Sequence, residues 1–457
     1  MEQYDLVILG AGSGNSIITP ALDDWKIAMV EEWVFGGTCL NRGCIPTKMF
    51  VHTADTVLHI QHASRLGVDA HVDAIRWDDI RDRVFNRIDP IAAGGERYRT
   101  NECPNVTVHA GRGRFVGERQ LEVATADGPV QIAGSQVVVA AGARPLVPDI
   151  PGLVETGFHT SDDIMRVEQV PEHLIVLGGG FIACELSHVF GAFGAKVTIV
   201  VRGNQLLRSE DHDIAAAITT DFARRFDVRS NATVTLVERA GDRVLVHLQD
   251  GSVIEGSDIL VATGRVPNSD VIDAAAGGLA VHPDGRIRVD LTGATSVPGV
   301  WALGDISSPW MLKHVANHEA RVVAHNIANP GNLHESDYRA VPHAVFTNPQ
   351  IASVGLTERE AVAADIDVMT TIHRYSDVAY GWALEDTESF CKLVADRATR
   401  HLVGAHIIGP HASSLIQQLV QGIRYGATID EMARGQYYVH PALGEVVENA
   451  LLRFDVA

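Results

Sequence analysis

Short apolar runs recur along the 457-residue chain, and each ends at glycines or at a charged residue. One run covers residues 6–9 and leads into a glycine-rich turn and an expected helix; the next covers residues 27–30 and ends at Glu31. The same order returns with runs at residues 174–177 and 197–201. Runs this short and apolar predict buried strands of parallel sheets, and their alternation with helical segments favours an α/β fold.

Three further apolar runs end in paired signals of the same kind, at residues 137–139, 259–261 and 300–303. From about residue 340 onward the strands become shorter, as at residues 344–346 and 392–394, and two late helices are expected. Because 457 residues exceed one ordinary hydrophobic core, about three domains are expected. The pattern predicts a doubled nucleotide-binding fold followed by a unit of different character.

The first glycine loop has the composition of a dinucleotide-binding turn. Gly10 and Gly12 let the backbone turn tightly and approach a pyrophosphate, which the N-terminus of the following helix would bind. Gly14 stands one position early and Asn15 replaces the third glycine of the usual pattern, which weakens the motif. Glu31 ends the next strand, where an acid can accept a hydrogen bond from a ribose hydroxyl.

The second glycine loop, Gly178-Gly179-Gly180-Phe181-Ile182-Ala183, follows its strand in the same way. Its next strand ends at Arg202, and Arg208 follows. Two guanidinium groups would hold a 2′-phosphate that a carboxylate would repel, so the sequence predicts NADPH rather than NADH. The alternative is that both arginines only solvate a loop. Two glycine loops with different strand ends indicate two different nucleotides.

Cys39 and Cys44 lie five positions apart in a glycine-rich turn after the first loop. A regular helix would hold their Cα atoms about 8–9 Å apart, whereas a disulfide needs less than about 7 Å. A bridge therefore requires a distorted turn, which Gly43 and Pro46 can supply. A strained, accessible bridge beside a cofactor is expected to be labile and catalytic. The alternatives are half a zinc site or two inert core cysteines, but the other three cysteines are isolated.

Composition and charge limit the class of protein. A hydrophobic content of 46% with 42 glycines fits an α/β enzyme. Five cysteines are too few for a secreted disulfide scaffold, and the N-terminus runs directly into a strand, so a cytoplasmic protein without a signal peptide is expected. No stretch approaches the ~20 apolar residues of a membrane helix. The net charge of −20 argues against a nucleic acid or an anionic membrane as partner. No bound metal is expected.

Taken together and in this order, the motifs resemble the flavoprotein disulfide reductases over essentially the whole chain. The resemblance rests on the cysteine pair, the two glycine loops, and three later motifs: Ala262-Thr263-Gly264-Arg265, Ala302-Leu303-Gly304-Asp305 and His440-Pro441-x3-Glu445. The chain is most similar to the mycothione reductase branch, through residues 35–50, 314–321, 378–387 and 433–443. Asn15 also resembles that branch, whereas Arg42 in the cysteine turn is less typical.

The resemblance implies a glutathione reductase-like fold with two Rossmann-like nucleotide-binding domains and a C-terminal α+β dimerisation domain. The expected units are residues 1–148 (first part of the FAD-binding domain), 149–267 (NADPH-binding domain), 268–338 (second, central part of the FAD domain) and 339–457 (dimerisation domain). A homodimer is implied.

The resemblance also implies a site for each cofactor. Glu31 would bind the adenosine ribose of FAD, Asp305 its ribityl chain, and the backbone around Gly113 its adenine. The helix after Lys313 and His314 would direct its positive dipole end at the flavin. The residues expected at FAD are Gly10, Gly12, Ser13, Gly14, Glu31, Gly37, Thr38, Cys39, Lys48, Gly113, Ala141, Gly142, Asp305, Lys313 and His314. Those expected at NADPH are Gly178, Gly180, Phe181, Ile182, Glu185, Arg202, Arg208 and Gly264.

The catalytic roles follow from the same resemblance. Cys44 would rest as a thiolate beside the flavin, and Cys39 would attack the substrate disulfide. Lys48 would pair with Glu185 near the flavin. Phe181 would shield the flavin face that NADPH approaches, although ordinary core packing explains a phenylalanine equally well. Without the resemblance, Lys48 would be interpreted as a solvated helix residue.

His440 and Glu445 form the expected base and its orienting acid. Pro441 can start a helix that carries Glu445 in its first turns, which would place the carboxylate against the imidazole. In this family the histidine enters the other subunit's site, so the active sites are expected to be shared across the dimer.

The sequence therefore predicts NADPH-dependent reduction of a low-molecular-weight disulfide, with mycothione as the expected substrate. The alternatives are dihydrolipoamide dehydrogenase and glutathione-disulfide reductase. The first uses NAD, so an acid rather than Arg202 should close the strand of the second loop. A redox sensor that carries only a flavin would have no need of both His440 and Glu445.

Overall fold

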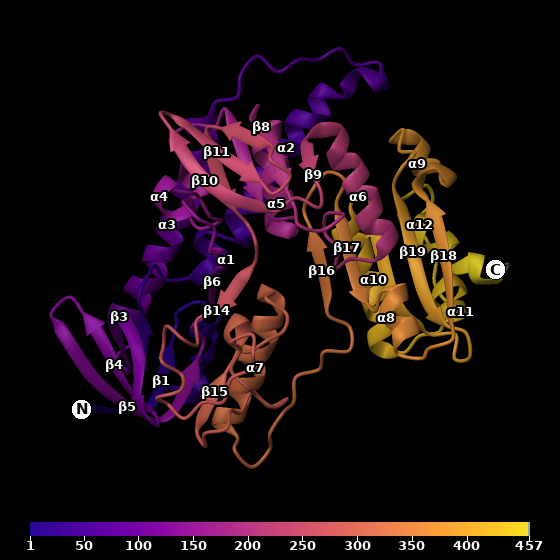
Figure 1. Cartoon of the computed structure of the whole chain (residues 1–457). Helices are drawn as coiled ribbons and strands as arrows, with labels where there is room; N and C mark the ends of the chain where they lie inside the picture. Colours follow the sequence, from indigo (N-terminus) through magenta and orange to yellow (C-terminus); the bar gives the residue numbers. More distant parts are fainter. Residues whose placement is uncertain (456–457) are drawn as a thin grey trace.

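Three sheets of six, four and five strands organise the chain, and helices cover them (Figure 1). The computed structural model describes residues 1–455, so the last two residues of the expected 339–457 unit lie outside the described residues. The four-stranded sheet and most of the six-stranded sheet are parallel, whereas the five-stranded sheet is antiparallel. The observed architecture is the predicted α/β fold with two nucleotide-binding units and a C-terminal α+β unit.

The six-stranded sheet forms the core of the first unit. Its strands are β1 (Glu2–Leu9), β2 (Ile27–Glu31), β3 (Val106–Gly117), β4 (Gln120–Thr125), β5 (Gly128–Val139) and β15 (Val300–Ala302). The parallel order is β3-β2-β1-β5-β15, and β4 forms an antiparallel meander between β3 and β5. Because β1 lies in the middle, the first glycine loop leaves the carboxyl edge at the centre of the sheet, where nucleotides bind in such folds.

Four α-helices belong to this unit: α1 (Gly37–Asn41), α2 (Cys44–Gln61), α3 (Trp77–Asn101) and α7 (Lys313–Ala328). Side chains of α7, among them Ala320 and Val323, pack with Leu6, Ile8 and Met29 in one buried cluster. The 3-10 turns of the unit are η1 (Ser13–Ile17), η2 (Pro20–Leu22), η3 (Ala63–Leu66) and η5 (Gly304–Ile306).

The expectation of a helix after the first glycine loop is wrong, because only the 3-10 turns η1 and η2 form there. Glycine, asparagine and serine are poor helix formers, and Pro20 cannot continue a helix. Asn15 is held from outside: Arg99 of α3 donates from Nε to its Oδ1 at 2.8 Å and from NH2 to its backbone carbonyl at 3.2 Å. The atypical Asn15 therefore acts as an anchor for a 3-10 turn.

The second unit is built on the parallel sheet β13-β7-β8-β9. Its strands are β7 (His173–Leu177), β8 (Lys196–Val200), β9 (Asp227–Arg229) and β13 (Asp258–Val261), beside an antiparallel sheet of β10 (Val234–Ala240), β11 (Arg243–Leu248) and β12 (Val253–Gly256). Its helical segments are α4 (Leu153–Thr156), η4 (Ile164–Arg166), α5 (Phe181–Ala192) and α6 (His212–Arg225). A ribbon of β6 (Ala143–Pro145) and β14 (Arg265–Pro267) lies where the chain enters and leaves this unit.

The C-terminal unit has the antiparallel order β16-β17-β20-β19-β18. The strands are β16 (Pro342–Val345), β17 (Ile351–Gly355), β18 (Val368–Arg374), β19 (Phe390–Asp396) and β20 (Leu402–Ile408). The helical segments are α8 (Glu358–Ala363), η6 (Tyr375–Asp377), α9 (Ala379–Ala383), α10 (Ala412–Tyr425), α11 (Ile429–Arg434), α12 (Gly444–Leu452) and η7 (Arg453–Asp455).

The expectation of two late helices is wrong, since five α-helices occur between residue 340 and residue 455. Three of them have only five or six residues, too few for a helical periodicity. The capping boxes Thr357…Glu360 and Thr428…Glu431 are the sequence signal that identifies two of these short helices. Across residues 1–455, no helix combines the length and the apolar character that a membrane crossing requires.

Candidate functional site

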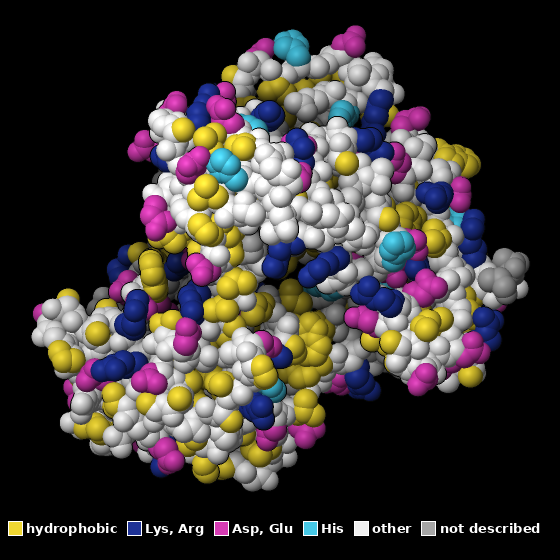
Figure 2. All heavy atoms as spheres, viewed as in Figure 1, with side chains coloured by type: hydrophobic (Ala, Val, Ile, Leu, Met, Phe, Trp, Pro, Cys, Tyr) yellow, Lys and Arg dark blue, Asp and Glu magenta, His cyan; other side chains and the backbone are white. Residues whose placement is uncertain are grey.

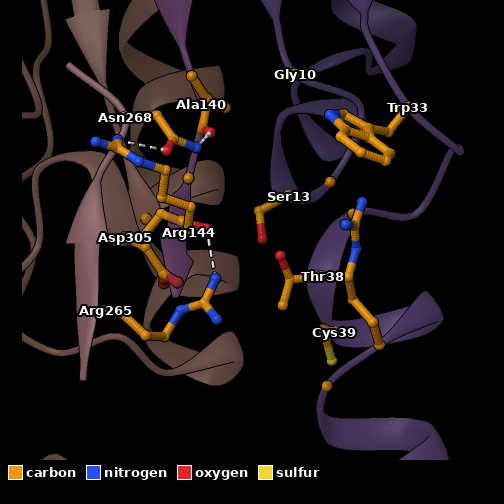
Figure 3. A pocket seen from close by; sticks show the side chains of 18 of the residues that line it. Gly10, Ser13, Trp33, Thr38, Cys39, Ala140, Arg144, Arg265, Asn268 and Asp305 are labelled. Atoms are coloured by element: carbon orange, nitrogen blue, oxygen red, sulfur yellow. Dashed lines mark hydrogen bonds between the residues drawn. The ribbon is translucent and has the colours of Figure 1, made fainter. Parts of the chain in front are cut away.

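A cavity of about 430 Å³ lies between the first glycine loop, the cysteine turn, the start of α5 and the start of α7. Figure 2 shows the molecule hollowed between its parts, with Lys and Arg side chains at the edge of the hollow. Figure 3 shows Asp305 and Arg265 on one side and Ser13, Thr38 and Cys39 on the other. The sequence-predicted residues that line it are Gly10, Gly12, Ser13, Glu31, Gly37, Thr38, Cys39, Cys44, Lys48, Gly113, Ala141, Gly142, Phe181, Ile182, Glu185, Asp305 and Lys313.

Bare backbone forms the wall at the first glycine loop. Gly10 has φ +106°, and a Cβ there would lie 2.4 Å from the carbonyl oxygen of Ala140. A Cβ on Gly37 would lie 2.8 Å from the Cα of Gly12, so the two glycines face each other closely. Lys313 donates a hydrogen bond to Ser13 Oγ at 2.8 Å and places a cation beside this cradle. A cradle without side chains next to a cation fits the pyrophosphate of FAD.

Two carboxylates mark the ends of parallel strands in the cavity. Glu31 accepts hydrogen bonds from the backbone N–H of Ala11 at 2.7 Å and of Trp33 at 2.9 Å. Asp305 accepts no hydrogen bond from another residue within 1–455, and burial raises the pKa of its carboxyl group, although Arg265 and Lys313 act against this. An acid without a partner in a cavity wall fits a ligand hydroxyl, as a ribityl chain supplies.

Lys48 and Glu185 form an ion pair in the cavity wall. The Nζ of Lys48 lies 2.7 Å and 2.9 Å from the two carboxylate oxygens of buried Glu185. The backbone N–H of Phe346 donates to Glu185 at 2.9 Å, and Lys48 Nζ lies 4.7 Å from the centroid of the Phe346 ring. The pair therefore joins α2 of the first unit to α5 of the second and keeps a positive charge next to the cysteines.

The cysteine turn separates two helices. Cys39 lies in α1 and Cys44 begins α2, with Arg42 and Gly43 between the helices. Gly43 has ψ −117°, and a Cβ there would lie 3.0 Å from the carbonyl oxygen of Thr38, which explains how the distorted turn forms. Both side chains are free thiols.

The two thiols differ in acidity. The hydrogen bond between them, together with the charge of Lys48, lowers the pKa of Cys44 to about 7 against the effect of partial desolvation. The same hydrogen bond, burial and the charge of Cys44 raise the pKa of Cys39. This difference in acidity has the direction that a thiolate at Cys44 requires. A second, open cavity of about 540 Å³ touches Cys44 and Lys48 from the side of Phe346.

His440 and Glu445 form a pair at a distance from this cavity. The Nδ1 of His440 lies 2.7 Å from Glu445 Oε1, and the backbone N–H of Ala442 donates to the other carboxylate oxygen at 3.1 Å. The hydrogen bond with His440 lowers the pKa of Glu445. The expected start of the helix at Pro441 is wrong, because α12 begins at Gly444, with Glu445 as its second residue.

The cysteines and His440 do not meet within one chain. Neither His440 nor Glu445 lines the cavity of the cysteines, and Figure 1 draws α1 and α12 well apart. The His440 side chain is 72% exposed, so its Nε2 side is open to another molecule.

The second glycine loop lies at the carboxyl end of β7. Gly178 has φ +126°, and a Cβ there would lie 2.2 Å from the carbonyl oxygen of Ala262. Gly180 caps α5 without a side-chain hydrogen bond, so the first N–H groups of this helix are free for a ligand. Arg202 and Arg208 are exposed, and within residues 1–455 no carboxylate lies within 4 Å of either guanidinium. Gly264, at φ +134°, lies beyond β13 of the same sheet.

Comparison with known proteins decides the family. The family model described as pyridine nucleotide-disulphide oxidoreductase matches residues 4–320, and the dimerisation domain of the same family matches residues 341–451. The chain belongs to the pyridine nucleotide-disulphide oxidoreductases. It is an enzyme, and the cofactors of this family are FAD and NAD(P)H, in agreement with the prediction.

Individual relatives cover the whole length. The chain is 50% identical to mycothione reductase of Mycobacterium tuberculosis over 99% of both chains. It is 33% identical to dihydrolipoyl dehydrogenase of Chlamydia trachomatis, over 99% of this chain and 97% of the relative. Among solved structures, the HOCl-induced flavoprotein disulfide reductase RclA from Escherichia coli superimposes with a TM-score of 0.86 at 27% identity, covering 98% of this chain and 99% of that one.

Two residues predicted at FAD lie outside the cavity, and several residues that line it had no predicted role. Gly14 packs behind it against Ile8 and Ala140, and His314 hydrogen-bonds the carbonyl oxygen of Pro342 at 2.8 Å. The cavity-lining residues to which the sequence motifs assigned no role include Trp33, Arg42, Arg144, Asp162, Arg265 and Asn268. Arg42 contacts Asp162 at 3.2 Å from 120 positions away, a pairing that sequence spacing alone does not reveal.

Proposed function

We propose that the enzyme reduces a low-molecular-weight disulfide with electrons from NADPH, and that its substrate is mycothione. The observation that carries the proposal is the Cys39–Cys44 dithiol, with its unequal acidities, in the wall of a cavity that fits FAD. The choice of mycothione rests on the 50% identity to a mycothione reductase, against 31–33% for relatives named for other substrates. A cytoplasmic location belongs to the same proposal, because a dithiol of this kind works in a reducing compartment.

The chemistry that bound FAD would supply is the transfer of two electrons from NADPH to the Cys39–Cys44 disulfide. Gly10, Gly12 and Ser13 would hold its pyrophosphate, and Glu31 and Asp305 would bind its sugar hydroxyls. The Lys48–Glu185 pair places a cation with a fixed position beside the cysteines, and this cation stabilises the Cys44 thiolate.

The reduced pair then transfers two electrons to the substrate. The Cys39 sulfur, once deprotonated, attacks one sulfur of the substrate disulfide, breaks the S–S bond and releases the first thiol. The Cys44 thiolate attacks the Cys39 sulfur of the mixed disulfide, which releases the second thiol and restores the Cys39–Cys44 bond. Of the two protons on the product thiols, one comes from Cys39 and one is taken up from water, because Cys44 reacts as a thiolate.

His440 would act as the acid and base of this exchange. It takes the proton of Cys39, whose pKa is raised, and returns it to the leaving thiolate, while Glu445 orients the imidazole through Nδ1. Because His440 does not reach the cysteines of its own chain, we assign this role to His440 of a second copy in a homodimer, for which the dimerisation domain is present.

A panel of disulfides tests the substrate. Purified holoenzyme is assayed by NADPH oxidation with mycothione, glutathione disulfide and lipoamide at matched concentrations. The proposal expects the highest kcat/KM with mycothione. A higher kcat/KM with lipoamide or glutathione disulfide would assign the enzyme to the corresponding alternative.

The Arg202→Ala variant tests the coenzyme. Loss of a charge-assisted contact to the 2′-phosphate costs about 1.5–3 kcal/mol, so kcat/KM for NADPH should fall roughly 10- to 150-fold while that for NADH stays unchanged. Arg229→Ala is the matched control, since Arg229 ends the neighbouring strand and already pairs with Asp227 at 2.8 Å. Equal losses with NADPH and NADH would refute the assignment of Arg202.

A further inference from the structure

The loop between β8 and α6 covers residues 201–211 and is anchored by hydrogen bonds to neighbouring segments. The backbone N–H of Leu207 donates to the carbonyl oxygen of Gly179 in the second glycine loop at 2.7 Å. A Cβ on Gly203 would lie 3.6 Å from Cδ of Arg208, so the stem of Arg208 packs over the turn next to Arg202. The two arginines proposed for the 2′-phosphate therefore lie on one short loop.

Leu207, directly before Arg208, has φ +46°. A bulky side chain adopts this left-handed conformation rarely, and it persists only where the surroundings hold it on both sides. Gly179 provides one side, and the side chain of Leu207 is buried at 4% exposure. The loop is also held from within the second unit, where the N–H of Leu206 donates to Thr219 Oγ1 at 3.0 Å, and the residues that follow Arg208 add contacts with the C-terminal unit.

Glu210, two residues after Arg208, is buried against the C-terminal unit. Its Oε1 lies 2.7 Å from His343 Nε2 of β16, and its Oε2 accepts a hydrogen bond from Ser353 Oγ of β17 at 2.8 Å. Burial alone would raise the pKa of Glu210, but the hydrogen bond and charge of His343 lower it overall. Glu210 in turn raises the pKa of His343 against the effect of burial. Each partner therefore favours the charged form of the other.

The next residue, Asp211, pairs with a buried lysine. Lys392 of β19 contacts Asp211 at 2.8 Å, and also Asp213 at 2.6 Å and Glu358 at 2.7 Å. The side chains of Lys392 and Asp211 are 3% and 1% exposed. Asp211 also accepts a hydrogen bond from the backbone N–H of Asp213 at 3.1 Å and so caps α6.

Buried ion pairs contribute little net stability, because the cost of removing charges from water offsets their attraction, but breaking one leaves an uncompensated charge. Their specific effect is to hold geometry. We infer that the cluster of Glu210, Asp211, His343, Ser353 and Lys392 positions Arg208 for the 2′-phosphate of NADPH, so that the C-terminal unit sets the coenzyme preference. This inference rests on the proposed role of Arg202 and Arg208. All five are positioning residues, since none of them lies in the nucleotide site.

Equilibrium binding to the folded holoenzyme tests the inference. The ligands are 2′,5′-ADP, which carries the 2′-phosphate, and NADH, which lacks it. Changes at residues that do not touch a ligand shift its affinity by about 2- to 30-fold. We expect His343→Leu and Lys392→Met to lower the affinity for 2′,5′-ADP by such a factor and to leave the affinity for NADH unchanged. His343→Gln, which keeps a hydrogen-bond donor for Glu210, should restore most of the lost affinity.

Glu388→Gln is the matched control. Glu388 pairs with Arg224 and so also joins α6 to the C-terminal unit, but at an exposed position at the other end of the helix. This variant should change neither affinity. Unchanged 2′,5′-ADP binding in both His343→Leu and Lys392→Met, or an equal loss of 2′,5′-ADP and NADH, overturns the inference. If Lys392→Met does not fold, the affinities of His343→Leu for 2′,5′-ADP and NADH decide whether the inference holds.

Arg208→Ala in the same assay separates this inference from the function on which it rests. A loss of 2′,5′-ADP affinity in Arg208→Ala without one in His343→Leu leaves the coenzyme assignment intact and rejects the cluster. If Arg208→Ala and Arg202→Ala both bind 2′,5′-ADP as the unchanged enzyme does, the coenzyme assignment itself fails.

Discussion

The Cys39→Ser variant is expected to lose disulfide turnover completely and to keep Cys44 as a thiolate. A serine hydroxyl still donates a hydrogen bond to Cys44, and Lys48 stays in place, so the pKa of Cys44 should remain near 7. Its alkylation by iodoacetamide should therefore rise with pH through about pH 7, where the thiolate forms. In the oxidised holoenzyme, a thiolate beside the flavin should also produce a long-wavelength absorption band.

The Cys44→Ser variant should lose turnover as well but show neither signature. Burial still raises the pKa of the remaining Cys39, so its alkylation should need higher pH. Cys103→Ser is the control, because Cys103 is buried outside the cavity and should change nothing. The comparison is decisive because exposure alone would favour Cys44 as the attacking thiol, since the open cavity touches Cys44. A band and a low alkylation pKa in Cys44→Ser instead of Cys39→Ser would reverse the two roles.

The parallel core was predictable because its strands are apolar on both faces. In β1 and β2, residues 6–8 and 27–30 are fully buried, which leaves a continuous hydrophobic run and a charged or glycine end in the sequence. The site residues at the ends of these strands follow from the same logic, because the carboxyl ends of parallel strands meet at one edge.

The errors occur where distant contacts decide local structure. In the turn after Gly12, poor helix formers are joined by a distant contact: Arg99, 84 positions away, donates to the side chain and the carbonyl of Asn15. His314 is the second residue of α7, and its ring hydrogen-bonds the carbonyl oxygen of Pro342 instead of lining the cavity. Local propensity contains no information on either contact.

The charged cluster behind the second nucleotide site shows the same limit. Lys392 stands in the apolar run Phe390-Cys391-Lys392-Leu393-Val394, and a lysine in such a strand signals a buried partner. Its partner Asp211 lies 181 positions earlier, next to the loop of Arg208. The sequence thus shows that a partner exists but not which one, and only the fold connects it to the coenzyme.

The His440→Ala variant is expected to lose about 10²- to 10⁴-fold in disulfide turnover, the usual contribution of a positioned acid and base. The expected loss follows from the acidity of Cys39, whose raised pKa makes it a poor nucleophile without a base. Bleaching of the flavin absorbance by NADPH should stay largely intact, because His440 lies outside the cavity of its own chain. Stopped-flow absorbance measures this step separately from steady-state turnover.

Mixing of inactive subunits shows whether His440 serves its own chain or its partner. A hybrid of Cys39→Ser and His440→Ala chains holds one site with both defects and one site with the cysteines of one chain and the histidine of the other intact. Random exchange makes about half of the dimers hybrid, so turnover should return to about a quarter of that of the unchanged enzyme.

A mixture of Cys39→Ser and Cys44→Ser chains is the matched control. Both cysteines come from one chain in every site, so no combination of these subunits contains an intact pair, and turnover should stay absent. If hybrids of Cys39→Ser and His440→Ala, verified by mass, also remain inactive, then His440 acts on the cysteines of its own chain. In that case the His440 side chain, which is 72% exposed, would have to reach the cysteines by a rearrangement within one subunit.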